Sequence, residues 1–211
     1  TGTIQWQKAL GGSGDEIGYS IQQTTDSGYI IAGLSISNDG DVSGNHGSYD
    51  AWVAKLTSTG SIVWQKSLGG SASDRAMSVQ QTMDNCYIVG GYAISNDGDV
   101  SGNHGNEDFW VVKLSSTGAI LWQNALGGSG TDVGNYIRQT SDSGYVIVGY
   151  SASSTGDVTG NHGGFDYWVA KLSSTGVLQW QQSLAGSAFD HATSVEQMPD
   201  STYIVAGFSL S

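Results

Sequence analysis

The fold of this chain is decided by residues 6–63, a stretch that opens with WQKALGGSGDEIGYSI at residues 6–21. Its pattern returns three more times at a spacing of 58 residues, without an insertion or a deletion. The positions that recur in register are Trp6, Trp64, Trp122 and Trp180; Leu10, Leu68, Leu126 and Leu184; Tyr29, Tyr87, Tyr145 and Tyr203; and Gly33, Gly91, Gly149 and Gly207. A fixed period of this length is typical of repeat proteins, in which each unit packs against its neighbours.

Each period contains four segments that are typical of β-strands, separated by turns or loops. In the first copy they are residues 17–24, 29–35, 51–56 and 62–68, here called strands a, b, c and d. Strands b and c carry apolar residues at odd and even positions, so both of their faces must be covered. Strand d is the most polar and carries Lys66 or its equivalent Lys8, as an exposed outer edge does. These features predict an all-β fold, a β-propeller of four-stranded antiparallel blades with strand a innermost, in a single domain of residues 1–211.

The two ends do not complete a ring of blades. The pattern predicts a lone strand d at residues 4–10, three complete units, and a final a and b at residues 194–198 and 203–210. The chain therefore holds about three and a half repeats, with the last blade incomplete. Three alternatives remain open, because the ring can be completed by further sequence, by strands from another copy, or not at all. Since the chain starts at Thr1 without a signal segment, we expect a mature or excised piece of a longer protein.

Composition narrows the function classes. The chain has 19 Asp and Glu against seven Lys and Arg, a net charge of -12, which excludes nucleic acid as a partner. No apolar run approaches the roughly 20 residues that a membrane-spanning helix needs, so we expect no membrane insertion. The only cysteine, Cys86, cannot form an internal disulfide. The copies keep the same acids and show no nucleophile motif, so we expect no enzyme; cleavage of glycosides by paired carboxylates is the least favoured alternative.

The strongest candidate for chemistry is the loop between strands b and c, which reads NDGDVSGNHG at residues 38–47. Carboxylates, amide oxygens and flexible glycines suit calcium, a hard cation that takes six to eight oxygen ligands. The alternative is that these side chains cap the backbone N–H groups of the loop itself. The candidate calcium ligands are Asp41, Asn45, Asp50, Asp99, Asn103, Asp108, Asp157, Asn161 and Asp166. The loop histidines, His46, His104 and His162, each stand alone, so we expect hydrogen bonding from them rather than transition-metal binding.

The order of the strands sorts the connections onto two faces. In an up-and-down meander the d-to-a and b-to-c connections emerge on one face, and this face receives 14 of the 19 acids. We expect it to attract cations or basic partners. The mid-strand tryptophans Trp52, Trp110 and Trp168 are expected in the core, and the strand d set in rim packing.

Three parts of the first repeat, residues 6–21, 26–29 and 50–56, resemble the bacterial β-propeller repeats of the SBBP and delta-60 type. The resemblance covers essentially the whole chain, although the loop at residues 38–47 departs from the usual pattern. It implies an exported bacterial protein, extracellular or at the cell surface, in a family that is non-catalytic or of unknown function. We therefore expect a binding or adhesion module for a protein or glycan ligand, with calcium in its loops. The alternative is a structural subunit that self-assembles into a homo-oligomer or filament through its unpaired strands.

Overall fold

The computed structural model describes residues 1–184 and 186–210, and every regular element in them is a β-strand. The strands are β1 (Glu16–Gln23), β2 (Tyr29–Ser35), β3 (Asp50–Leu56), β4 (Ile62–Leu68), β5 (Asp74–Gln81), β6 (Tyr87–Ala93), β7 (Asp108–Leu114), β8 (Ile120–Leu126), β9 (Asp132–Gln139), β10 (Tyr145–Ser151), β11 (Asp166–Leu172), β12 (Leu178–Leu184), β13 (Asp190–Gln197) and β14 (Tyr203–Ser209). In these described residues, a helix long and apolar enough to cross a bilayer is not found.

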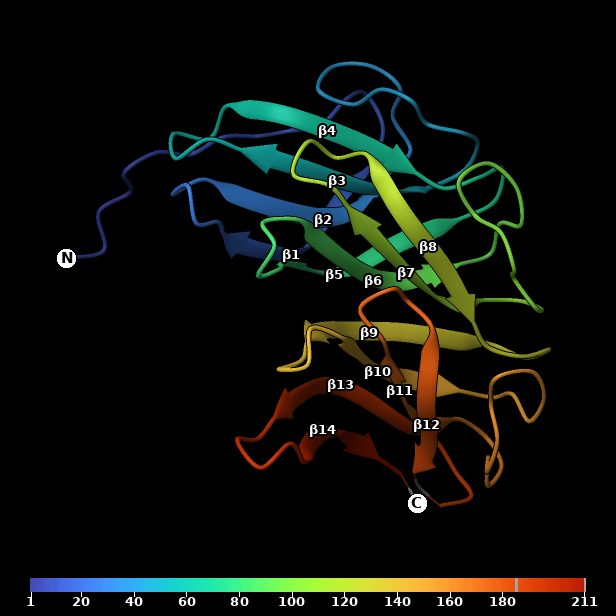
Figure 1. Ribbon diagram of the computed structural model, residues 1–211. Coiled ribbons are helices and arrows are strands. Elements are labelled where there is room, and N and C mark those ends of the chain that lie inside the picture. The colour runs from blue at the N-terminus through green and yellow to red at the C-terminus, as the bar shows by residue number, and fades with distance from the viewer. Residues whose placement is uncertain (185, 211) are drawn as a thin grey trace.

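The strands form successive antiparallel sheets that follow the order of the chain. Strands β1–β4, β5–β8 and β9–β12 make three four-stranded sheets, and β13 pairs with β14 alone. The first strands of neighbouring sheets contact one another, β1 with β5, β5 with β9 and β9 with β13, so they lie innermost (Figure 1). This is the blade layout of a β-propeller over about three and a half repeats, which confirms the predicted fold class.

The predicted strand at residues 4–10 is wrong. The first strand of the structure begins at Glu16, and the N-terminal segment extends away from the sheets (Figure 1). Trp6 nevertheless occupies the place of its repeat equivalents, because its ring meets Tyr29 edge-on at 5.7 Å, as Trp64 meets Tyr87 at 5.6 Å. The pattern of the repeat is present, but among the described residues no strand c lies beside this segment to pair with its backbone. The final strand a is also longer than predicted, since β13 begins at Asp190.

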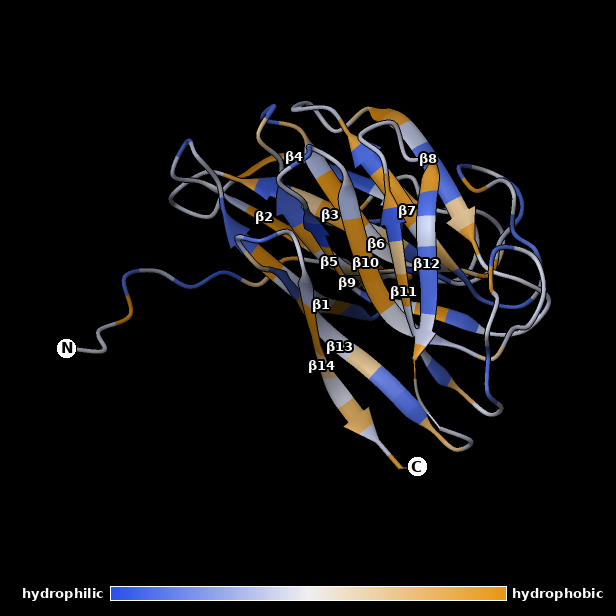
Figure 2. Cartoon of the chain, turned by 60° about the horizontal axis from the view of Figure 1, so that its bottom comes forward, coloured by the Kyte–Doolittle hydropathy of each residue, from blue (hydrophilic) through white to orange (hydrophobic). Residues whose placement is uncertain are grey.

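The core lies between the blades and is made mainly by strands b and c, with buried residues of strand a such as Val79 and Ile137. Trp52, Trp110 and Trp168 are buried, which confirms their predicted core role. Figure 2 shows the contrast between the hydrophobic β10 and the hydrophilic β12 at the outer edge of the same sheet. The first two blades share one apolar cluster, which includes Ile30 and Val89, so the core is continuous across the junction.

Two backbone details explain recurring residues. The pairing of β1 with β2 is interrupted by a bulge between Gly18 and Ser20, and there the backbone of β1 comes so close to Gly33 that an added Cβ would lie 1.9 Å from the Ile17 carbonyl oxygen. The same approach recurs at each copy, so the repeated glycine is required by the bulge. In the turn between β1 and β2, the left-handed residue is Ser27, with φ of 66°, and the glycine that follows it, Gly28, is not left-handed.

Candidate binding site at the blade junctions

The b-to-c loops and the d-to-a connections lie on one face, as predicted, because they bind each other directly. In the first repeat, Oδ1 of Asp39 accepts a hydrogen bond from the N–H of Ser13 at 2.8 Å, and Oδ2 of Asp41 accepts one from Gly11 at 3.2 Å. In the second repeat Asp97 accepts a bond from Ser71 in the same way. The acids of these connections therefore gather on one face, and they also hold its backbone in place.

The predicted calcium ligands form hydrogen bonds with different backbone groups. Asp41, Asp99 and Asp157 each accept a bond from the glycine that follows a strand d or its equivalent. The side-chain amides of Asn45, Asn103 and Asn161 donate to the last carbonyl of strand b, at Ser35, Ala93 and Ser151. Asp50, Asp108 and Asp166 begin strand c and are buried. Asp50 accepts a bond from the loop N–H of His46, and Asn45 accepts one from Gly47, as the capping alternative expects, whereas Asp41 caps a glycine outside the loop. Calcium binding by the loops stays a prediction.

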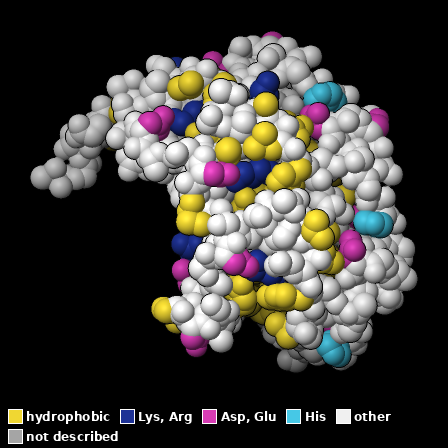
Figure 3. Space-filling model, viewed as in Figure 1, with side chains coloured by type: hydrophobic (Ala, Val, Ile, Leu, Met, Phe, Trp, Pro, Cys, Tyr) yellow, Lys and Arg dark blue, Asp and Glu magenta, His cyan; other side chains and the backbone are white. Residues whose placement is uncertain are grey.

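Each loop histidine is a hydrogen-bonding residue, which confirms that expectation. Nδ1 of His46 lies 2.7 Å from Oδ2 of Asp50, and the backbone N–H of His46 donates to the same oxygen at 3.0 Å. His104 with Asp108 and His162 with Asp166 repeat this pair. The three rings are partly exposed. Figure 3 shows histidine side chains along one margin of the molecule.

A second carboxylate faces each of these buried aspartates from the next blade. Asp74, which begins β5, is buried, and its backbone N–H donates to the carbonyl of Tyr49 at 2.7 Å, next to Asp50. Its carboxylate accepts bonds from the N–H groups of Gly70, Ile94 and Ser95 and from the Ser95 hydroxyl. The pairing of Asp74 and its equivalents with the first residue of strand c was not predicted from the sequence. The signal was the invariant spacing of 24 residues between the two acids in three copies.

Burial dominates the electrostatics of these pairs. It raises the pKa of Asp50 above its ordinary range, the bonds from His46 oppose that rise, and the neighbouring charge of Asp74 adds to it. Burial likewise raises the pKa of Asp108, opposed by His104 and reinforced by Asp132. Within the described residues, no three His, Cys, Asp or Glu side chains come together as a metal-binding group. The junction is thus a place where two carboxylates, rather than a larger cluster, lie close together.

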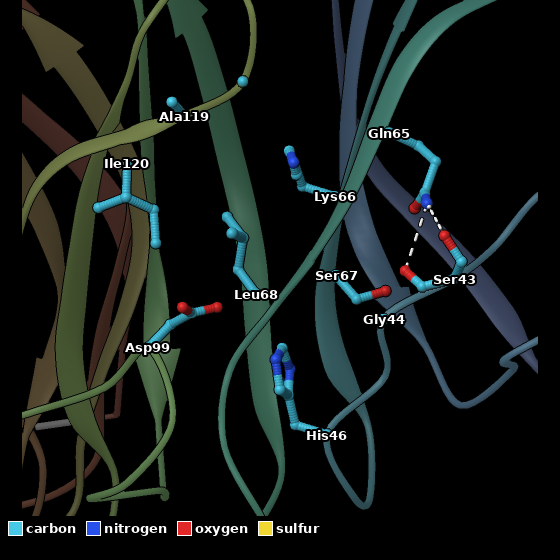
Figure 4. Close-up of a pocket in the computed structure, with 11 residues that line it drawn as sticks. Ser43, Gly44, His46, Gln65, Lys66, Ser67, Leu68, Asp99, Ala119 and Ile120 are labelled. Atoms are coloured by element: carbon cyan, nitrogen blue, oxygen red, sulfur yellow. Dashed lines mark hydrogen bonds between the residues drawn. The ribbon is translucent and has the colours of Figure 1, made fainter.

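An open groove lies beside each of the first two junctions. The first has a volume of about 430 Å³ and is lined by Lys66 of β4, by His46, by Asp99 of the next loop and by Ile120 of β8 (Figure 4). The second has about 370 Å³, and His104, Asn124, Asp157 and Leu178 take the corresponding places. Both grooves therefore present donors and acceptors from the outer strand of one blade and the loop of the next.

The comparisons with known proteins bear on the fold alone. No family model and no curated protein matches this chain. The structure is similar to a crystal structure of a protein of unknown function from Bacteroides caccae, with a TM-score of 0.52 and 11% identity over 96% of this chain. A structure titled as the eukaryotic initiation factor matches with a TM-score of 0.45 and 12% identity over 87% of this chain and 36% of its own. This chain spans 57% of the length of the Bacteroides caccae protein.

Proposed function

We propose that the chain is a non-catalytic extracellular or cell-surface binding module, whose blade junctions hold successive units of a polar repetitive ligand such as a glycan or a surface protein. The observation that carries this proposal is the recurrence of the groove at two successive junctions, with a histidine and an aspartate at equivalent positions. The resemblance to exported SBBP-type repeats supports the location. Calcium in the acidic loops remains part of this proposal as a stabiliser of the binding face.

Repeated grooves on one scaffold can combine several weak contacts with a ligand into stronger binding. A single shallow polar groove binds a small ligand weakly, but two grooves on one rigid scaffold convert the second contact into an intramolecular event, which raises avidity by about 10²–10⁴-fold. The ligand must then repeat at the spacing of the blades. A polymer of identical sugar units satisfies this condition, and so does a basic repetitive protein, because the same face carries most of the acids.

The test is a binding screen followed by obstruction of the grooves. Ala119 lines the first groove and Val177 the second, and both are exposed residues of c-to-d turns. We expect Ala119→Trp or Val177→Trp alone to weaken binding of a hit from a glycan and surface-protein panel at least tenfold, and the double variant to abolish it. The matched control is Ser61→Trp at the equivalent position of the first blade, where neither groove lies. Absence of any hit, or a hit unaffected by the double variant, contradicts the proposal.

A second function, self-assembly, is favoured by the exposed faces at the two ends of the arc. Ile21 of β1 is 62% exposed, whereas its equivalent Val79 is 5% exposed because the preceding blade covers it. Ile204 of β14 is 57% exposed, whereas its equivalent Ile88 is fully buried. A second copy that placed its β1 on β14 would reproduce the contact that β6 makes with β9. Such a head-to-tail contact generates a closed ring or a filament.

Self-assembly is tested by light scattering over a wide concentration range. We expect a mass above that of the monomer at high concentration, and its loss in Ile21→Lys. The control is Val63→Lys, which changes another exposed residue, on the outer strand β4. A monomer at every concentration rules out this second function.

A further inference from the structure

The buried carboxylates at the blade junctions leave oxygen atoms without a partner. Asp50 and Asp74 are both fully buried, and so are Asp108 and Asp132. Oδ1 of Asp50, Oδ1 of Asp108 and Oδ1 of Asp132 accept no hydrogen bond from the described residues. A buried acceptor with no donor is costly, and buried polar side chains almost always have a partner in native proteins.

The unpartnered oxygens of strand c point at the carboxylate of the next blade. A Cβ added to Gly69 would lie 3.0 Å from Oδ1 of Asp50 and 2.7 Å from Oδ2 of Asp74. A Cβ added to Gly127 would lie 2.6 Å from Oδ1 of Asp108 and 2.6 Å from Oδ2 of Asp132. The two oxygens are therefore no more than about 5.7 Å apart in the first pair and about 5.2 Å apart in the second. In both cases a glycine keeps the space beside the pair free of a side chain.

The negative charge of these pairs is not balanced by a basic side chain. Among the described residues, the only nitrogen of a basic side chain within ion-pair distance of Asp50 or Asp108 is the imidazole of His46 or His104, and it binds the other oxygen, Oδ2. The Lys55 and Lys113 ammonium groups are engaged with Asp26 and Asp84 of the a-to-b turns. Two like charges at this separation in a buried site repel each other unless a cation or a proton lies between them.

We propose that Asp50 with Asp74, and Asp108 with Asp132, each bind one hard divalent cation of the calcium class between neighbouring blades. Two carboxylates at one junction attract a doubly charged ion, and an all-oxygen donor pair selects calcium-like ions over softer metals. This site differs from the loop sites expected from the sequence, because its second ligand comes from the next blade and neither Asp41 nor Asn45 contributes. The ion would join β3 to β5 and β7 to β9, so it would stabilise the stacking of blades.

The measurement is calcium titration of the metal-free chain by calorimetry, with terbium luminescence as a second readout. We expect two equivalents with dissociation constants of about 1 mM or tighter, the range of extracellular calcium modules, and a higher Tm with calcium than with chelator. The double variant Asp50→Asn, Asp108→Asn should lose both equivalents and the calcium-dependent rise in Tm. Gly127→Ala, which inserts a methyl group beside one pair, should lose one equivalent.

The matched control is Asp41→Asn, Asp99→Asn, which changes two loop acids that cap backbone N–H groups. It should keep both equivalents, and circular dichroism should show that all variants retain the β-sheet signal. No saturable binding, or binding lost in the control while Asp50→Asn, Asp108→Asn keeps it, overturns the junction site. Ligand binding to the grooves is read separately, with chelator present, so failure of the ion site and failure of the proposed function are distinguishable.

Discussion

The ammonium of Lys171 lies 2.9 Å from Oδ2 of Asp142, although Lys171 belongs to the middle strand β11 and its side chain is only 4% exposed. Lys55 with Asp26 and Lys113 with Asp84 repeat this pair in the other two complete blades. A buried ammonium needs a charge partner and hydrogen-bond acceptors, and the a-to-b turn supplies both on the face opposite the acidic loops. Each pair therefore fastens a turn to the strand c of its own blade.

These pairs predict a loss of stability in acid. The Thr140 hydroxyl, opposed by partial burial and helped by Lys171, holds the pKa of Asp142 at about 2. For Asp84, burial is outweighed by Thr82 and Lys113, and its pKa is also about 2. An Asp in the unfolded chain has a pKa of about 3.9. The stabilisation of the folded state by these ionised aspartates is therefore complete above about pH 4 and is lost as the pH falls through about 2.

The test compares urea unfolding of the wild type with Asp26→Asn, Asp84→Asn, Asp142→Asn between about pH 5 and pH 2. The carboxylates are more than half exposed, so each pair should contribute about 1 kcal/mol or less. We expect the triple variant to be less stable at pH 5 and to lose less on acidification. The control is Asp200→Asn, the equivalent turn position in the last blade, where no strand c provides a lysine. If the free energy of unfolding falls by the same amount on acidification in the wild type and in the triple variant, these Asp–Lys pairs are not the source of the acid sensitivity.

The strand d tryptophan packs between two neighbouring blades. The ring of Trp64 lies 5.6 Å from that of Tyr87 in the next blade, and its Nε1 donates to the carbonyl of Ser116 at 3.1 Å. We expect Trp64→Ala to lower the free energy of unfolding by about 2–3 kcal/mol, below the usual range for fully buried tryptophans because its side chain is only partly buried. Trp6→Ala should cost less than about 1 kcal/mol, since its segment lacks strand pairing. Equal losses in the two variants would mean that residues 1–15 are held as firmly as β4.

Most of the fold could be predicted because the repeat multiplies weak signals. One copy of YIIAGLS at residues 29–35 is an ambiguous apolar run. Four copies in register, three of them followed by a glycine-rich loop, leave few architectures. The error at residues 4–10 has a physical origin: alternation of side chains shows that a segment can be a strand, but pairing depends on a neighbour that the sequence pattern does not supply. The left-handed conformation of Ser27 could not be predicted from the sequence either, since the neighbouring Gly28 has the stronger intrinsic preference for it.

The site was less predictable than the fold. The loop motif singled out Asp50 as a candidate calcium ligand, and the structure shows it buried beside His46. Its pairing with Asp74 depends on how two blades dock, and this contact joins residues from different repeats. The buried Lys55 was also missed, because nothing in the sequence distinguishes this lysine from a solvent-facing one, and only the structure places the carboxylate of Asp26 next to it.

The bulge of strand a provides the sharpest test of the backbone geometry. Gly91 lies in β6, and an added Cβ would be 1.9 Å from the carbonyl oxygen of Arg75, which is fixed backbone that cannot turn aside. We expect Gly91→Ala to lower the free energy of unfolding by about 3 kcal/mol, at the upper end of overpacking penalties. Gly102→Ala is the control, because Gly102 has a φ of 84° but no atom within 4 Å of an added Cβ, so only the left-handed backbone penalty of about 1–2 kcal/mol applies. Chemical unfolding of both variants measures the difference, and a Gly91→Ala protein as stable as Gly102→Ala would show that the bulge relaxes to accommodate a methyl group.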